Sequence, residues 1–157
     1  MKVFLYDFKD SFTLNIFTTI KNQLDKNTEI HLIEYNELDT KKHMEGLINN
    51  NTRSLVILGP GPGHPDDYQA LHYTIKKLLK CEHIFSLGIC LGHQLIACSL
   101  ELRIKRSASP MHGQEQIYSL KKKTQKELGL PKSINVQKYN SLCVSSDKYN
   151  TARLKEL

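Results

Sequence analysis

The sequence has no long apolar run, no Cys-x-x-Cys pair and no low-complexity segment, and each absence excludes a class of protein. No run approaches the roughly 18 to 20 apolar residues that a membrane-spanning helix needs, and Asp7 comes too early for the apolar core of a signal peptide. Apolar residues make up 39% and charged residues 24% of the 157 residues, which excludes an intrinsically disordered chain. We therefore expect a single cytoplasmic domain over residues 1–157 that contacts no membrane.

The spacing of the four cysteines excludes the common cysteine-based metal and redox motifs. Cys81, Cys90, Cys98 and Cys143 do not alternate with histidines, so we expect no zinc ribbon, no thioredoxin-type site and no bound metal. A chain of this length with an ordinary apolar fraction also has no need of a disulfide scaffold. We expect buried free thiols, unless the neighbours of one cysteine give it a chemical role.

Basic residues exceed acidic residues by 22 to 16, a formal net charge of +6. The densest basic runs, Lys121–Lys123 and Arg103–Arg106, have no aromatic residues interleaved with them. Aromatic residues between basic ones are typical of nucleic-acid binding, so we expect a solvated surface and no nucleic-acid partner. A negatively charged small substrate, or a negatively charged partner surface, remains compatible with this charge.

Apolar periodicity alternates along the first hundred residues between that of strands and that of helices. This alternation predicts an α/β fold, with a mostly parallel open sheet flanked by helices. We expect Ser11 to cap the first helix, and Asp66 or Asp67 to cap the third. More polar strand candidates in the C-terminal third predict an antiparallel extension. The expected strands are 3–6, 29–35, 54–58, 84–87, 102–105, 116–120 and 134–144, and the expected helices begin near residues 11, 38, 66 and 90.

Two glycine-containing segments, 59–65 and 88–94, follow the third and fourth expected strands, where open parallel sheets bind ligands. In the second, Cys90 has glycines two residues to either side, which is the spacing of a nucleophile elbow. Cys90 would then begin a helix whose dipole favours the thiolate. The backbone N–H of Leu91 would face a developing oxyanion, and Gly61 in the first segment is the candidate second donor.

Gln94 lies one helical turn after Cys90 on the same face. From its spacing alone, a contact with a polar substrate and simple exposure to solvent are equally compatible. The other three cysteines are expected to be structural, because Cys98 continues an apolar helix face, Cys143 lies in a strand and Cys81 joins a helix to a strand.

Together these segments resemble the class I glutamine amidotransferases, and within them the glutaminase subunits of chorismate-aminating synthases. The resemblance covers essentially the whole chain. The segments 7–13, 59–65, 88–94, 111–113 and 139–142 match the family's motifs, with Phe8, Gln114 and Asn140 standing where the family has Asn, Lys and His.

The resemblance implies hydrolysis of L-glutamine, with Cys90 as the nucleophile and the N–H groups of Gly61 and Leu91 as oxyanion donors. It implies no cofactor. Ammonia would pass to the large, chorismate-binding subunit of anthranilate or aminodeoxychorismate synthase, and that partner determines which of the two products is made. The implied glutamine-binding residues are Gly61, Pro62, Gly63, Gln94, Ser141 and Leu142.

One motif of the family has no match here. The family's catalytic histidine and glutamate lie in a C-terminal His-Pro-Glu stretch, whereas the last histidine of this sequence is His112. We therefore expect the domain to be incomplete at its C-terminus, and the 157-residue chain to be inactive or weakly active by itself. The alternatives are a shortened, non-enzymatic partner of the synthase and a cysteine hydrolase that acts on another substrate.

Overall fold

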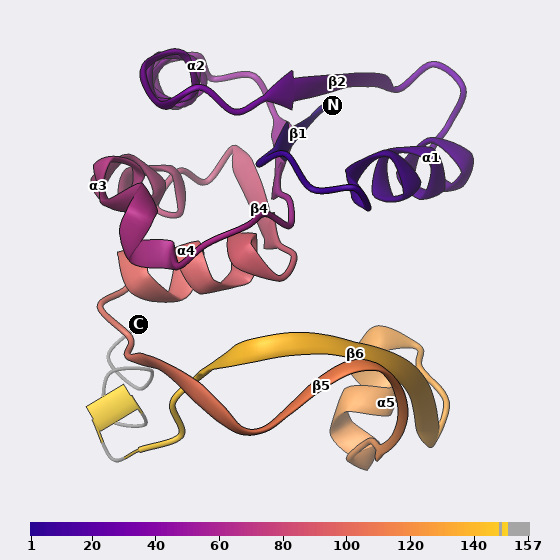
Figure 1. Ribbon diagram of the computed structural model, residues 1–157. Coiled ribbons are helices and arrows are strands. Elements are labelled where there is room, and N and C mark those ends of the chain that lie inside the picture. The colour runs from indigo at the N-terminus through magenta and orange to yellow at the C-terminus, as the bar shows by residue number, and fades with distance from the viewer. Residues whose placement is uncertain (148, 151–157) are drawn as a thin grey trace. The chain divides into compact units, whose positions relative to one another are not determined.

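The computed structural model describes residues 1–147, 149 and 150 (Figure 1). The described chain divides into two compact units. The first contains Met1–Ile104 together with the described residues after Cys143, and the second contains Lys105–Cys143. None of the helices within the described ranges combines the length and the hydropathy of a membrane-spanning segment.

The first unit is built on a parallel sheet of four strands, in the order β2-β1-β3-β4. The central strands are almost entirely apolar because side chains on both of their faces are buried. This arrangement confirms the predicted open parallel sheet. The strands are β1 (Lys2–Asp7), β2 (Glu29–Glu34), β3 (Ser54–Leu58) and β4 (Ile84–Gly88).

Helices cover both faces of this sheet. Alternate residues of β1 point to opposite faces, so Val3 and Leu5 pack against α1, whereas Phe4 and Tyr6 belong to the larger core that includes residues of α2, α3 and α4 (Figure 1). This is the layered arrangement that the sequence periodicity predicts. The helices are α1 (Thr13–Gln23), α2 (Glu37–Asn49), α3 (Gln69–Leu78) and α4 (Leu91–Ser99), with a 3-10 turn, η1, at Pro65–Tyr68.

Both predicted helix caps are wrong. Thr13 begins α1 without a side-chain cap, and Asp10, rather than Ser11, accepts the Phe12 N–H at 2.9 Å. His64 caps η1, because its ring accepts the Asp66 N–H while the carboxylate of Asp67 accepts the His64 N–H at 2.7 Å. Asp10 therefore acts from one residue before the predicted cap, and Asp67 supports the turn from within η1 and not as its cap.

The second unit is an antiparallel pair of strands, β5 (Ile104–Ser119) and β6 (Ser133–Val144), connected through α5 (Lys122–Leu128). The predicted antiparallel extension is confirmed. Its details differ, since the predicted strands 102–105 and 116–120 belong largely to one continuous strand, and α5 was predicted only as a solvated basic run. Gly129 ends α5 in the left-handed conformation, with a φ of 63°.

The β4 edge of the sheet is only partly covered by the described residues. No further strand in the described ranges pairs with β4, and Phe85 and Leu87 on this strand are each 49% exposed. An apolar hollow of about 340 Å³ lies beside Leu87, lined in part by Ile16 and Ile89. This is the kind of exposed apolar surface expected beside an unpaired sheet edge.

Candidate functional site

Cys90 lies in the sharp turn between β4, which ends at Gly88, and α4, which begins at Leu91. Its backbone has a φ of 53° and a ψ of −110°, a conformation that costs a residue with a side chain on the order of 1–3 kcal/mol. The side chain is exposed. The strained, protruding position that the elbow spacing predicts for Cys90 is therefore present.

The glycines on either side of Cys90 are required by close backbone packing. A Cβ on Gly88 would lie 2.5 Å from the backbone nitrogen of His93, and a Cβ on Gly92 would lie 1.9 Å from the carbonyl oxygen of Leu58. No side chain fits at either distance. The glycine requirement inferred from the spacing is thus explained at Gly92 by the approach of α4 to the end of β3, and at Gly88 by the backbone of the first turn of α4.

The loop after β3 lies directly beside the elbow. The Ile89 N–H donates to the Leu58 carbonyl at 2.9 Å, and the Gly92 N–H donates to the Gly59 carbonyl at 3.1 Å. Further along this loop, a Cβ on Gly61 would lie 2.6 Å from Cδ2 of Leu91. The two loops that the sequence analysis identified, 59–65 and 88–94, are therefore held together at the carboxyl ends of β3 and β4.

The remaining residues of the loop after β3 are held by internal contacts. The Pro62 carbonyl accepts a hydrogen bond from the Tyr68 hydroxyl at 3.0 Å. Gly63 has a φ of 81°, and a Cβ there would lie 2.6 Å from Oδ2 of Asp67. These contacts fix the backbone of the loop before any ligand binds, which is the property that an oxyanion donor needs.

A third loop, between β1 and α1, reaches the same region. The carboxylate of Asp7 organises it by accepting hydrogen bonds from the N–H groups of Lys9 and Asp10 and from the Thr13 hydroxyl, at 2.8, 3.2 and 2.8 Å. Lys9 adopts a φ of 67° within this turn. The negative charge of Asp10 acts on the Cys90 thiol. Our sequence analysis missed this influence, although the loop follows the carboxyl end of a parallel strand, as the other two do.

The local environment disfavours the thiolate of Cys90. Although Cys90 is exposed overall, partial desolvation of its sulfur raises the pKa of the thiol; a hydrogen bond from the Leu91 N–H lowers the pKa, and the charge of Asp10 raises it, for a net increase. The prediction that the helix N-terminus favours the thiolate is therefore outweighed in this structure by desolvation. The Leu91 N–H that interacts with the sulfur begins α4, and its role as an oxyanion donor stays a prediction.

Neutralising Asp10 is expected to make Cys90 more reactive at lower pH. Asp10→Asn removes the charge that disfavours the thiolate and keeps an oxygen able to accept the Phe12 N–H, so the pKa of the Cys90 thiol should fall. The pH profile of Cys90 alkylation by iodoacetamide, followed by peptide mass spectrometry, should then move to lower pH. A profile that stays in place, or moves to higher pH, contradicts the assigned influence of Asp10.

Gln94 is buried, with 8% of its surface exposed, so the alternative of a solvent-exposed glutamine is wrong. Its neighbours on α4, Leu91 and Leu95, are also buried. Ser141 and Leu142 are half-buried on β6 in the second unit, where the Ser141 hydroxyl lies 3.2 Å from Nε2 of His112. Binding of glutamine by Gln94, Ser141 and Leu142 stays a prediction.

The expectation of a buried thiol is wrong for Cys81, Cys98 and Cys143, whereas the exposure of Cys90 agrees with the position predicted for it in the elbow. Cys81, Cys98 and Cys143 are half-buried and Cys90 is exposed, each as a free thiol. Burial, and to a smaller extent the charge of Asp66, raise the pKa of Cys98. Among the residues that the structure describes, no group of His, Cys, Asp and Glu side chains has an arrangement that could hold a metal ion.

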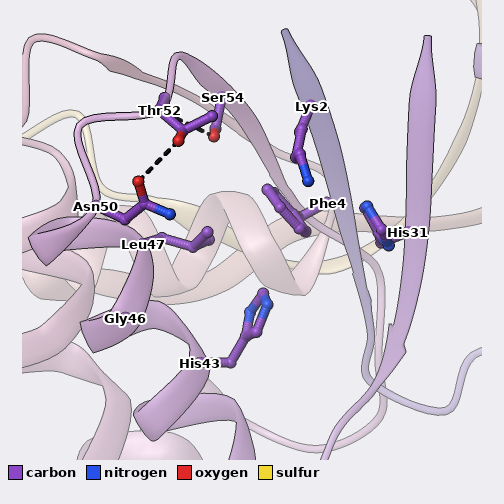
Figure 2. A pocket seen from close by; sticks show the side chains of 9 residues that line it. All are labelled: Lys2, Phe4, His31, His43, Gly46, Leu47, Asn50, Thr52 and Ser54. Atoms are coloured by element: carbon purple, nitrogen blue, oxygen red, sulfur yellow. Dashed lines mark hydrogen bonds between the residues drawn. The ribbon is translucent and has the colours of Figure 1, made fainter. Parts of the chain in front are cut away.

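A cavity of about 430 Å³ lies at the amino ends of the strands, opposite the ends that carry the elbow (Figure 2). Lys2 and Ser54, the first residues of β1 and β3, form part of its wall, whereas Cys90 follows the carboxyl end of β4. In the loop that forms another part of the wall, the Thr52 hydroxyl donates to the Asn50 side chain at 2.7 Å (Figure 2). The candidate site is thus assigned from the geometry of the elbow and not from this cavity.

The sequence of the chain is similar to a known protein family and to proteins of known name. The model of the family "Glutamine amidotransferase class-I" matches residues 4–156. The chain is 35% identical over 147 residues to anthranilate synthase component 2 of Cyanidium caldarium, across 93% of this chain and 69% of that protein. It is 29% identical over 146 residues to aminodeoxychorismate synthase of Streptomyces griseus, across 92% of this chain and 19% of that protein.

A solved structure supports the fold independently of close sequence similarity. The chain superimposes on a glutamine amidotransferase of Thermotoga maritima with a TM-score of 0.67 at 20% identity, across 92% of this chain and 62% of that one. At this identity the likeness shows the fold alone. The predicted fold class, a mostly parallel sheet flanked by helices with an antiparallel extension, is confirmed.

Proposed function

The chain belongs to the class I glutamine amidotransferase family, and we propose that it hydrolyses L-glutamine at Cys90 in the cytoplasm and supplies the ammonia to a chorismate-binding synthase subunit. One observation carries this proposal: Cys90 protrudes from a strained elbow that is hydrogen-bonded to the neighbouring loop through Gly59. The names of the relatives, an anthranilate synthase component and an aminodeoxychorismate synthase, support the choice of partner. Four free thiols accord with a reducing compartment.

The proposed chemistry begins with the thiolate of Cys90. Its sulfur attacks the side-chain amide carbon of glutamine, and the carbonyl oxygen takes up negative charge. The N–H groups of Leu91 and Gly61 stabilise that oxyanion. The C–N bond then breaks, a proton joins the leaving nitrogen and ammonia departs, leaving a thioester on Cys90. Water attacks the thioester and releases glutamate, which restores the thiol.

The raised pKa of the Cys90 thiol has a consequence for this scheme. Because the thiolate is the attacking form and the pKa of this thiol is raised, a base must take the proton when the reaction begins. A resting thiol is also less readily oxidised than a thiolate, because oxidation follows thiolate character.

The alternatives are less well supported than glutamine hydrolysis. A non-enzymatic subunit has no need of the tight packing of Gly88 and Gly92 that positions Cys90. A cysteine hydrolase of another substrate would share the elbow, but the family match extends over residues 4–156 and includes the loop that contains Gly61. Both alternatives predict that the complete natural chain releases no glutamate from glutamine.

Replacing Gly61 with alanine is expected to lower the rate of glutamine hydrolysis by about 10²-fold, the scale of losing one oxyanion donor. The new Cβ would lie 2.5 Å from Cβ of Phe8 and 2.6 Å from Cδ2 of Leu91, so the loop must move away from the elbow. Steady-state glutamate release by the complete natural chain with its synthase measures the effect. Unchanged kcat in a folded Gly61→Ala protein contradicts the role proposed for this loop.

A further inference from the structure

The excess positive charge of the chain lies entirely in the second unit. Residues 105–143 contain eight lysine or arginine residues against two glutamates, a formal charge of +6 that equals the charge of the whole chain. The first unit is therefore neutral overall. Lys121, Lys122, Lys123 and Lys126 concentrate four of these charges at or within α5, and all four are exposed.

This unit also lacks a core of its own. None of the residues from Lys105 to Cys143, all of which the structure describes, is buried, and α5 buries none of its residues. A two-stranded hairpin is marginally stable in water unless another surface packs against it. A unit built in this way gains stability when a partner covers it.

Large apolar side chains are exposed on the same unit. Ile117 is 72% exposed, Leu128 is 65% exposed and Tyr139 is 54% exposed. Aliphatic side chains gain free energy when a protein surface removes them from water, whereas a phosphate backbone offers them little apolar contact. The combination of lysines with Ile117 and Leu128 therefore favours a protein partner over a nucleic acid.

We propose that residues 105–143 form the surface on which an acidic face of the synthase subunit docks. This inference rests on the proposed function, which supplies the synthase as the partner. Opposite charges on the two surfaces accelerate their encounter and select the partner, and the exposed apolar side chains then become buried at the contact. The neutral first unit, which contains Cys90, contributes no net charge to this attraction.

Charge reversal on one unit at a time tests the proposal. One variant of the complete natural chain carries Lys121→Glu, Lys122→Glu, Lys126→Glu and Lys132→Glu; its control carries Lys21→Glu, Lys26→Glu, Lys42→Glu and Lys80→Glu. All eight lysines are exposed, and the two variants change the net charge equally. Affinity for the purified synthase subunit is measured at about 50 and about 300 mM salt.

The variant with the four substitutions between Lys121 and Lys132, called the hairpin variant, is expected to bind the synthase at least about 10-fold more weakly than the unaltered chain at low salt. The affinity of the control should stay within about threefold of that of the unaltered chain. The affinity of the unaltered chain should fall with salt, and that of the hairpin variant should fall less. The docking surface alone is overturned if binding weakens equally in both variants, or if it weakens in neither variant.

Failure of the unaltered chain to bind the synthase overturns the proposed partnership as well. A 20-base-pair DNA duplex that displaces the synthase from the unaltered chain at about 150 mM salt overturns the choice of a protein partner.

Discussion

Cys90→Ala is expected to abolish glutamine hydrolysis, with a loss of about 10⁴-fold or more in kcat. No other side chain replaces a nucleophile that forms the covalent intermediate, and the loss of such a group in a comparable covalent mechanism reaches about 10⁶-fold. The elbow itself should survive, because alanine keeps the Cβ of Cys90 and the packing of Gly88 and Gly92 does not involve the sulfur. Glutamate release by the complete natural chain with its synthase measures the effect.

Cys98→Ala is the matched control. Cys98 lies on the same helix, α4, and is half-buried, so the substitution also removes one thiol but leaves the elbow untouched. The glutaminase activity of Cys98→Ala should stay within about threefold of that of the unaltered chain, whereas its free energy of unfolding falls by about 1 kcal/mol or less.

Adding ammonia should restore product formation by the synthase with Cys90→Ala, because ammonia bypasses the missing step. Undiminished glutamate release by Cys90→Ala would show that another group is the nucleophile.

Gly92→Ala is expected to have the largest effect on stability, lowering the free energy of unfolding by about 3 kcal/mol or more. The added Cβ would lie 1.9 Å from the carbonyl oxygen of Leu58 and 2.5 Å from its carbonyl carbon. Backbone atoms at the end of a central strand cannot yield as a flexible side chain does. The clash should therefore push α4 away from β3 and inactivate the elbow at the same time. Chemical denaturation followed by circular dichroism measures the change.

Gly46→Ala is the matched control: it makes the same chemical change but is expected to raise the free energy of unfolding. Gly46 lies inside α2, and a Cβ added there would meet nothing within 4 Å. Alanine in a helix interior is more stable than glycine by roughly 0.5–1 kcal/mol, so this variant should unfold at a higher denaturant concentration. If Gly92→Ala were as stable as Gly46→Ala, the close approach of α4 to Leu58 would not exist in solution.

The first unit was predictable because its strands and helices bury apolar side chains at regular spacing. β3 matched its predicted range, 54–58, because each of its residues is apolar or small and it lies inside the sheet. The second unit was less predictable for the converse reason. β5 runs through Ser107, Ser109 and Gln114 without a buried residue, so no apolar pattern marks its length.

The candidate site was predictable where local spacing decides the geometry. Glycines two residues to either side of Cys90 predicted a turn that the packing of Gly88 and Gly92 explains. The pKa of Cys90 was not predictable in this way. It depends on how far the loops desolvate the sulfur and on the charge of Asp10, eighty positions away in the sequence. Spacing along one segment carries no information about such neighbours.

Covalent trapping tests the central claim most directly. The complete natural chain, with its synthase subunit, is incubated with a diazo-ketone analogue of glutamine, digested and mapped by mass spectrometry. The account predicts one adduct per chain, on Cys90, formed more slowly when glutamine is present. An adduct on Cys81, Cys98 or Cys143 instead of Cys90, or none at all while the unaltered chain releases glutamate, would contradict it.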